Sequence, residues 1–332
     1  MNILVANHKL DKTGGSQTFT YTLVGELVKR GYAVEYFTHK HGLISSKIQD
    51  DFGVGFMSQS SYDLILANHH TTVESLYGKG KIIQTCHGVF AGLERPSPLA
   101  DGYVAISQEV QDYLMRCGFQ SRIIYNGIDC NRFSPQKPLR KDNIRVLSLC
   151  HSEEAHALVE QACKLANAEF GRLDKYQDNQ WDVPAIINQY DLVFGLGRSA
   201  YESLACGRPV IIYDSRSYFT SAGDGYFLEV LPASLQNNCS GRALKRNFTV
   251  DGIADQIRKY RPEDGAIARG YALSCFNIEK AVDSYLEYAN SLESIKKMAK
   301  ISSSPCRFLL PSRVVKTFYR NVKRRITKGN AI

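Results

Sequence analysis

The sequence predicts an α/β protein with two doubly wound parallel sheets, and three observations support this. Short apolar runs alternate with helical patterns from residue 2 to about residue 290. Several runs are almost continuously apolar, as in strands covered by helices on both faces. A length of 332 residues suits two domains of roughly 100–200 residues each.

The first half of the chain supplies six candidate strands. They are Asn2–Ala6, Ala33–Phe37, Leu64–Ala67, Ile82–Thr85, Tyr103–Ile106 and Arg122–Tyr125. Two of the helices expected between them are Ser16–Arg30 and Gln108–Cys117, and a glycine suited to a C-terminal cap follows each helix. Strands that alternate with helices pair in parallel. We therefore expect one Rossmann-like domain over residues 1–134.

A second series of the same kind follows a polar stretch with two prolines. Residues 135–143 have the composition of an interdomain linker. The strands expected after this linker are Arg145–Leu149, Leu192–Phe194 and Pro209–Tyr213. They predict a second Rossmann-like domain over residues 144–275. A long helical pattern then covers residues 276–299, and we expect this helix to return toward the N-terminal domain.

The positive charge of the chain is concentrated at its C-terminal end. The formal net charge is +8, from 41 Lys and Arg against 33 Asp and Glu. Eleven of the basic residues and none of the acidic ones lie from Lys296 onward, which leaves residues 1–295 with a net charge near −3. A mildly acidic body argues against nucleic acid as a partner.

The tail of residues 300–332 has the pattern of a basic amphipathic helix. On a helical wheel, Val314, Phe318 and Val322 fall on one side, whereas Lys316 and Arg320 fall on the other. Such a helix suits an anionic membrane surface, so we expect membrane contact through residues 308–328. A plain solvated helix is the alternative.

The same sequence features predict a cytoplasmic protein, peripheral on the cytoplasmic face of the membrane. Residues 1–8 predict a first strand rather than a signal peptide. The longest apolar runs are far shorter than the ~18 residues that span a bilayer. The nine cysteines contain no C-x-x-C pair, which argues against a disulfide framework and a zinc site.

Two glycine-containing turns fall where open parallel sheets bind ligands, at the carboxyl ends of strands. In the first, Gly14 and Gly15 precede a helix whose N-terminus favours phosphate or a sugar oxygen. An ordinary loop is the alternative there. In the second, a strand ends in Gly195-Leu196-Gly197 and a helix opens at Arg198-Ser199.

The second turn also carries charges suited to a nucleotide. Arg198 can make bidentate contacts to a diphosphate, and Glu202, one turn later, can accept hydrogen bonds from the vicinal hydroxyls of a ribose. A simple i,i+4 ion pair between them is the alternative. Because the carboxylate lies beside an apolar helix face, we assign nucleotide binding to Gly197, Arg198, Ser199 and Glu202.

The same stretch also fits a dinucleotide fingerprint. Gly195, Gly197 and Ala200 have the spacing G-x-G-x-x-A, and Asp214 ends the next strand. An NAD(P)-dependent Rossmann oxidoreductase is therefore an alternative. Such a fingerprint normally opens its domain, whereas two strand–helix units are expected to precede this one.

Taken in order, these segments resemble glycosyltransferase family 4, a retaining family of the GT-B class, in which two Rossmann-like domains face a cleft. The resemblance covers about residues 2–290. Its segments are Gly14-Gly15, Lys29–Val34, Thr85–Gly88, Ala105–Ser107, Asn126–Asp129, Arg132–Pro135 and Glu202–Val210. The dinucleotide alternative gives no account of the segments in the first half.

The resemblance implies a hexosyltransferase that moves a sugar from a nucleoside diphosphate to a hydroxyl of a glycan or lipid-linked acceptor, in cell-surface polysaccharide biosynthesis. It places the acceptor against the first domain and the donor against the second. Glu202 would bind the ribose, Gly14 and Gly15 would face the donor diphosphate, and His87 would be the catalytic candidate at the reaction centre. His69 and His70 are expected to be structural or to face the acceptor.

Retention of stereochemistry is implied by the resemblance alone. The sequence has no Asp-x-Asp motif, so we expect neither a metal ion nor a cofactor.

Two departures from the family pattern bear on activity. The first of the family's two glutamates is absent, because Phe194 stands eight positions before Glu202. The cation pair after the first strand of the second domain is also absent from residues 149–156. Our hypothesis is that Arg198 supplies this positive charge. The departures leave a further alternative, an inactive glycosyltransferase-like module that binds nucleotide or glycan.

Overall fold

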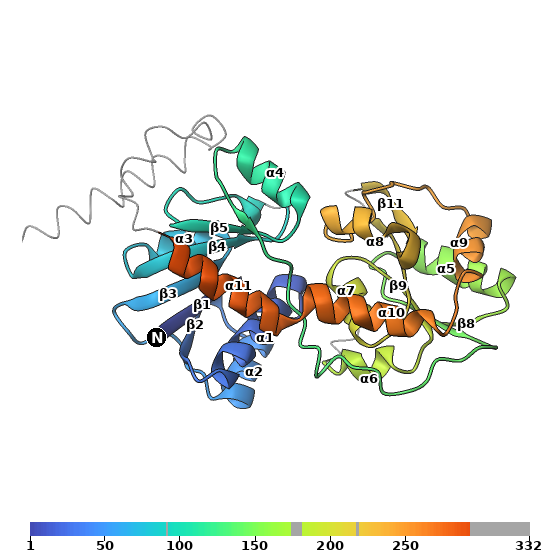
Figure 1. The fold of residues 1–332 in the computed structure, drawn as a ribbon, viewed down its shortest axis with the longest axis horizontal. Helices are drawn as coiled ribbons and strands as arrows, with labels where there is room; N and C mark the ends of the chain where they lie inside the picture. The colour runs from blue at the N-terminus through green and yellow to red at the C-terminus, as the bar shows by residue number, and fades with distance from the viewer. Residues whose placement is uncertain (91, 174–180, 217–218, 293–332) are drawn as a thin grey trace, which may run out of the picture.

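The computed structural model describes residues 1–90, 92–173, 181–216 and 219–292. They form two α/β units that lie side by side, each with its own sheet (Figure 1). The predicted fold class of two doubly wound sheets is confirmed, with one correction in the second sheet. The basic tail and residues 293–299 of the expected C-terminal helix lie outside the described residues.

The N-terminal sheet has six parallel strands in the order β2-β1-β3-β4-β5-β6. Alternate residues of β1 belong to two different hydrophobic cores, one on each face of the sheet. Ile3 and Val5 pack with α1, α2 and α11, whereas Leu4 and Ala6 pack with α3 and α4. Both faces of the sheet are therefore covered, as the apolar strands predict. The elements are β1 (Asn2–Lys9), α1 (Gly15–Lys29), β2 (Ala33–Lys40), α2 (Leu43–Phe52), β3 (Tyr62–Asn68), α3 (His70–Leu76), β4 (Gly80–Cys86), η1 (Gly92–Glu94), β5 (Gly102–Ala105), α4 (Gln108–Arg116) and β6 (Arg122–Ile123).

The C-terminal sheet has five strands in the order β11-β10-β9-β7-β8. Its first elements are β7 (Arg145–Ser148), α5 (Glu153–Leu165), β8 (Glu169–Arg172), α6 (Val183–Ile187), β9 (Leu192–Gly195) and α7 (Arg198–Ala205). The later ones are β10 (Val210–Arg216), β11 (Phe219–Tyr226), α8 (Phe227–Gln236), α9 (Val250–Ile257) and α10 (Asp264–Tyr271).

One strand corrects the prediction of purely parallel sheets, because β11 runs antiparallel to β10. Two residues separate these strands, which is too few for the crossover helix that a parallel pair requires.

Two segments that cross between the units lie against each other. The backbone N–H of Ile128 donates to the carbonyl oxygen of Phe276 at 2.6 Å, and that of Ile278 donates to the carbonyl oxygen of Ile128 at 3.0 Å. A π-helical turn, η2 (Ala272–Phe276), precedes this crossing, and α11 (Ile278–Ser291) follows it and packs on the N-terminal sheet. Figure 1 shows α10 and α11 in succession across the boundary. The two crossing segments are thus joined by a short parallel β-bridge.

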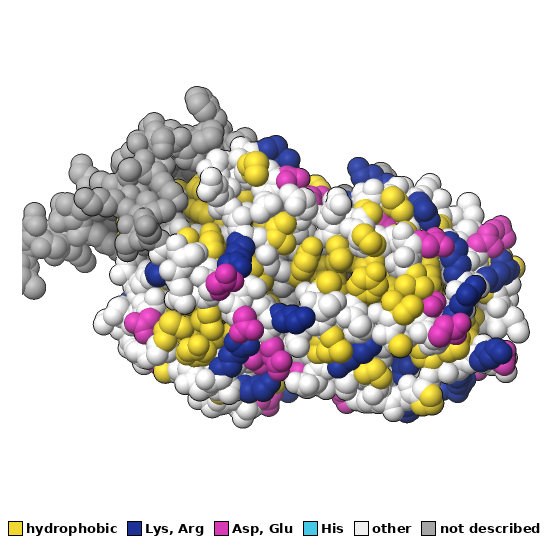
Figure 2. Space-filling model, in the orientation of Figure 1, with side chains coloured by type: hydrophobic (Ala, Val, Ile, Leu, Met, Phe, Trp, Pro, Cys, Tyr) yellow, Lys and Arg dark blue, Asp and Glu magenta, His cyan; other side chains and the backbone are white. Residues whose placement is uncertain are grey.

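The surface charge of the described body is mixed. On the face drawn in Figure 2, Lys and Arg side chains lie among Asp and Glu side chains over both units. Within the described residues, no helix combines the length and the apolar character required to cross a membrane.

Candidate functional site

The candidate site lies where the ends of strands from both sheets approach each other. The turn after β1 leads into α1, the turn after β4 carries His87, and the turn after β9 leads into α7. Arg198, the first residue of α7, donates from Nη2 to Oγ1 of Thr22 in α1 at 3.1 Å. Helices α1 and α7 lie next to each other between the two sheets (Figure 1). The sequence-predicted turns of the two domains therefore meet at one place.

The turn before α1 leaves room beside its second glycine. Gly14 is the N-cap residue and Gly15 opens the helix. A Cβ atom at Gly14 would meet the side chain of Gln17, whereas one at Gly15 would meet no atom within 4 Å. Packing therefore does not require glycine at position 15. Open space beside the N-terminus of a 15-residue helix is what an anionic ligand needs.

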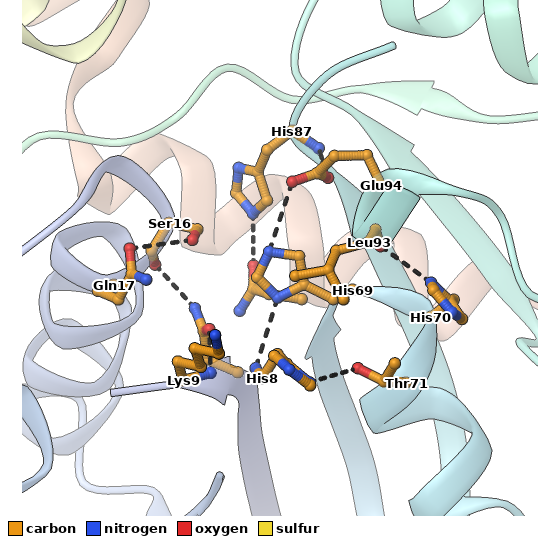
Figure 3. A network of polar contacts seen from close by, with 12 residues as sticks. His8, Lys9, Ser16, Gln17, His69, His70, Thr71, His87, Leu93 and Glu94 are labelled. Atoms are coloured by element: carbon orange, nitrogen blue, oxygen red, sulfur yellow. Dashed lines mark hydrogen bonds and ion pairs between the residues drawn. The ribbon is translucent and has the colours of Figure 1, made fainter. Parts of the chain in front are cut away.

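A polar network fixes the orientation of His87 (Figure 3). The Nδ2 group of Asn68 donates to the carbonyl oxygen of Ala6 at 3.0 Å and to Oγ1 of Thr20 at 3.2 Å. Asn68 Oδ1 is therefore the acceptor for His87 Nε2, 2.6 Å away. The backbone N–H of His87 donates to Oε2 of Glu94 at 2.6 Å. Since Nε2 carries the proton, Nδ1 of the neutral imidazole has a free lone pair.

His87 is neutral at pH 7. Burial lowers the pKa of His87 to about 4, although the Glu94 carboxylate opposes the shift, and the charges of His69 and Arg198 lower it further. Among the described residues, its Nδ1 and the Oδ1 of Asn126 are buried without a hydrogen-bond partner. Two buried acceptors without donors are costly, and a ligand hydroxyl would satisfy one of them.

Arg198 binds groups from both domains. Its Nε donates to Oε1 of Glu202 at 2.8 Å, and its Nη1 donates to the carbonyl oxygen of Gly127 at 3.1 Å. Together with the bond to Thr22, these contacts occupy all three nitrogens. The side chains of Arg198 and Glu202 are only 10% and 13% exposed. The i,i+4 ion pair expected as the alternative is therefore formed, in a buried setting that joins the two domains.

Gly197 sets the approach of α7 to this site. It has a φ of 57°, in the left-handed region that favours glycine, and it caps the helix. The N–H of Gly197 donates to the carbonyl oxygen of Cys239 at 2.9 Å. Ser199 follows in the first turn, and its carbonyl oxygen accepts a hydrogen bond from Ser203 Oγ at 2.8 Å.

Trp181, the only tryptophan of the chain, makes a second contact between the units. Its ring lies edge-on to Tyr21 of α1, with 4.7 Å between centroids. The Nζ of Lys47 and the Cζ of Arg132 lie 4.4 and 4.5 Å from its ring centroid. On the other side, Arg242 pairs with Glu109 of α4. These contacts flank the Arg198 bridge and hold the two units together.

Sequence reasoning assigned no role to four residues that shape this site. They are Thr22, Asn68, Glu94 and Asn126. Asn126 stands inside a motif that was recognised, and Asn68 directly precedes the His69-His70 pair, so a signal existed for both. Glu94 lies in a short 3₁₀ turn, η1, with no distinctive sequence around it. Thr22 belongs to the site because its Oγ1 lies 3.1 Å from Nη2 of Arg198. This contact depends on how the two domains are arranged, which the local sequence does not reveal.

Comparison with known proteins supports the fold. Residues 54–132 match the family model of Glycosyltransferase Family 4. An α-glucosyltransferase in complex with UDP and a 13-mer DNA containing a HMU base is similar over 88% of this chain and 100% of its own, with a TM-score of 0.55 and 11% identity. The chain has the GT-B fold, and its residues 54–132 are similar to Glycosyltransferase Family 4.

A second comparison gives the same fold. An α-glucosyltransferase in complex with UDP is similar over 87% of this chain and 99% of its own, with a TM-score of 0.51 and 10% identity. A comparison with curated protein sequences found no match.

The structure gives a physical reason for the first departure from the family pattern. Phe194, where the family has a glutamate, is fully buried in β9 and lies edge-on to Tyr213 at 6.3 Å. A carboxylate there would lie in the apolar core.

The second departure concerns the turn between β7 and α5. Ser152 caps α5, and the first turn of this helix carries Glu153 and Glu154. Asp214, the acidic residue of the dinucleotide alternative, accepts hydrogen bonds from the backbone N–H groups of His151 and Ser215. These carboxylates make the turn less favourable for a phosphate, which leaves Arg198 as the cation at the centre of the site.

Proposed function

We propose that this protein transfers a sugar from a nucleoside diphosphate to a hydroxyl of a glycan or lipid-linked acceptor. The observation that carries the proposal is the buried Arg198–Glu202 pair at the start of α7. Its arginine donates to Gly127 and Thr22 of the first domain and lies close enough to His87 to lower the pKa of that imidazole. One side offers groups for a nucleotide, and the other offers unpaired acceptors for a hydroxyl. A GT-B fold supplies this arrangement of donor and acceptor domains.

In the proposed mechanism, Glu202 accepts hydrogen bonds from the ribose hydroxyls. Arg198 and the backbone N–H groups at the N-terminus of α7, including that of Ser199, face the diphosphate and stabilise the charge that develops as it leaves. Gly14 and Gly15 leave space on the opposite side for the reacting groups. His87 Nδ1 accepts a hydrogen bond from a sugar or acceptor hydroxyl.

Further parts of this proposal come from the resemblance and the sequence. Retention of stereochemistry follows the family, and no metal ion or cofactor is expected because Arg198 and the helix N-terminus supply positive charge. UDP is the first donor nucleotide to test, since α-glucosyltransferases of the same fold bind it. Cell-surface polysaccharide biosynthesis is the setting that the family resemblance supports.

A thermal-shift screen tests the donor class. Uridine, guanosine and adenosine diphosphates, their sugars and NAD are each added to the full-length protein. Ligand present at 100 times its Kd stabilises the folded state by about 2.7 kcal/mol, which is readily measured. We expect a rise in Tm with one nucleoside diphosphate and its sugar. A rise with NAD alone would overturn the proposal in favour of the oxidoreductase.

We further propose that residues 308–328 hold the protein on the cytoplasmic face of an anionic membrane. Support comes from the sequence pattern, because this segment lies outside the described residues. Deletion of residues 300–332 should release the protein from anionic liposomes in a cosedimentation assay, with neutral liposomes as control. Equal cosedimentation with and without the tail would refute it.

A further inference from the structure

A row of aromatic and imidazole rings leads from the proposed reaction centre along the carboxyl edge of the N-terminal sheet. His87 lies 6.2 Å from His69, His69 lies 6.4 Å from His8, and His8 lies 5.2 Å from His39, between ring centroids. The row continues through Phe37, Phe56 and His41 at spacings of 5.0, 5.8 and 5.1 Å. Phe56 is 40% exposed, so the row leads from the buried site to the surface.

The inner part of this row is held rigidly. His69 has a φ of 78°, a strained value for a residue with a side chain. Its Nδ1 accepts a hydrogen bond from the backbone N–H of His8 at 3.4 Å, and its Nε2 lies 3.4 Å from Oε1 of Glu94 (Figure 3). His69 therefore carries its proton on Nε2 and links the row to His87. Backbone strain at a residue whose side chain is held by two polar contacts is typical of a functional site.

Three imidazole rings and the ammonium group of Lys9 lie around His8. Burial lowers the pKa of His8, and the charges of His39, His69, Lys9 and His70 lower it further. Two nearby carboxylates are engaged elsewhere, Glu94 with His69 and His87 and Asp11 with Lys40 at 2.7 Å. Burial raises the pKa of a third carboxyl group, that of Glu74, which is near His70. An anion beside His8 would meet the ammonium group of Lys9 and imidazole groups that become cations when they are protonated.

We propose that the acceptor of this enzyme is an anionic glycan, whose phosphodiester or carboxylate group binds beside His8 and His39 while its sugar rings lie along Phe37 and Phe56. The inference rests on the proposed glycosyltransferase function and names its acceptor class. Besides the histidines of the row, Lys9 supplies positive charge close to His8. A single lysine suits one negative group, whereas a nucleic acid needs cations at regular phosphate spacing.

Binding of the anion is coupled to protonation of His8. A bound negative charge raises the pKa of the imidazole, so protonation strengthens anion binding by the same factor. Affinity therefore increases as the pH falls from 8 to 6. A phosphodiester keeps one charge over this range, so the pH dependence comes from the protein.

Dimethyl phosphate and methyl glucuronide are suitable probes, added at pH 6 and 8 to the full-length protein saturated with UDP. Histidine C–H signals in NMR spectra report both Kd and the pKa of His8. For one or both probes we expect binding at least fivefold tighter at pH 6 than at pH 8. The probe that shows this dependence identifies the anionic group of the acceptor. His8→Gln should abolish this dependence. His41→Gln is the matched control, because His41 contacts Phe56 at 5.1 Å and belongs to the outer end of the row.

Several results would overturn the inference. These are affinity equal at both pH values, pH dependence that persists in His8→Gln, or tighter binding of a single-stranded oligonucleotide than of an anionic glycan with equal charge. UDP binding is measured in parallel by the Tm of the protein. Binding of UDP without pH-dependent anion binding refutes the acceptor class alone, whereas failure to bind any nucleotide refutes the proposed function.

Discussion

Arg198→Ala is expected to reduce the turnover of sugar transfer by about 10²–10³-fold, the usual effect of removing one preorganised group that stabilises developing charge. The guanidinium is 10% exposed, and its charge therefore acts in a medium of low dielectric constant. It is the cation at the centre of the site, since the turn between β7 and α5 carries Glu153 and Glu154 instead. Initial rates with a saturating nucleotide sugar measure the effect.

Two further variants separate charge stabilisation from loss of folding. Arg198→Lys keeps the charge but loses the planar set of donors, so its turnover should lie between those of wild type and Arg198→Ala. Arg258→Ala removes an arginine that pairs with Asp255 at 2.7 Å on an exposed helix surface, and it should leave turnover unchanged. Unchanged donor affinity and turnover in Arg198→Ala would remove Arg198 from the mechanism.

The sheet strands could be predicted because burial on both faces leaves a strong signal. Residues such as Ile3, Leu4 and Val5 are all fully buried, and a continuous apolar run reports this directly. The strand β8 was missed because its sequence, Glu-Phe-Gly-Arg, has only partly buried or exposed residues at the edge of the sheet. Local sequence carries little information about an edge strand, whose partner alone fixes its conformation.

The parts of the site that could be predicted lie next to strand ends with glycine or charged residues. Arg198 and Glu202 fall in this class, since their spacing places them on one helix face. Their contacts with Thr22 and Gly127 could not be predicted, because these depend on how two separately folded units meet. The free lone pair on Nδ1 of His87 follows from the hydrogen bonds that Asn68 makes. Only the folded sheet brings these two residues together.

Glu202→Gln should weaken UDP binding by roughly 10- to 100-fold. Hydrogen bonds to a charged group contribute about 1.5–3 kcal/mol, and each 1.4 kcal/mol is a factor of ten in Kd. The substitution keeps the shape of the side chain and removes its charge. Arg198 retains its bonds to Gly127 and Thr22, so the interface between the domains should persist. Isothermal titration with UDP measures the change, and the fluorescence of Trp181 checks that the domains remain in contact.

A comparison of UDP with 2′-deoxy-UDP decides whether Glu202 binds the ribose. If the carboxylate accepts a bond from the 2′-hydroxyl, wild type should prefer UDP, and Glu202→Gln should lose most of this preference, because each change removes the same interaction. Glu160→Gln is the matched control, since Glu160 forms an i,i+4 pair with Lys164 at 2.9 Å on an exposed helix face. It should keep both affinity and preference. A full preference for UDP in Glu202→Gln would mean that the carboxylate serves only to hold Arg198, and the nucleotide would then have to bind through other groups of α7.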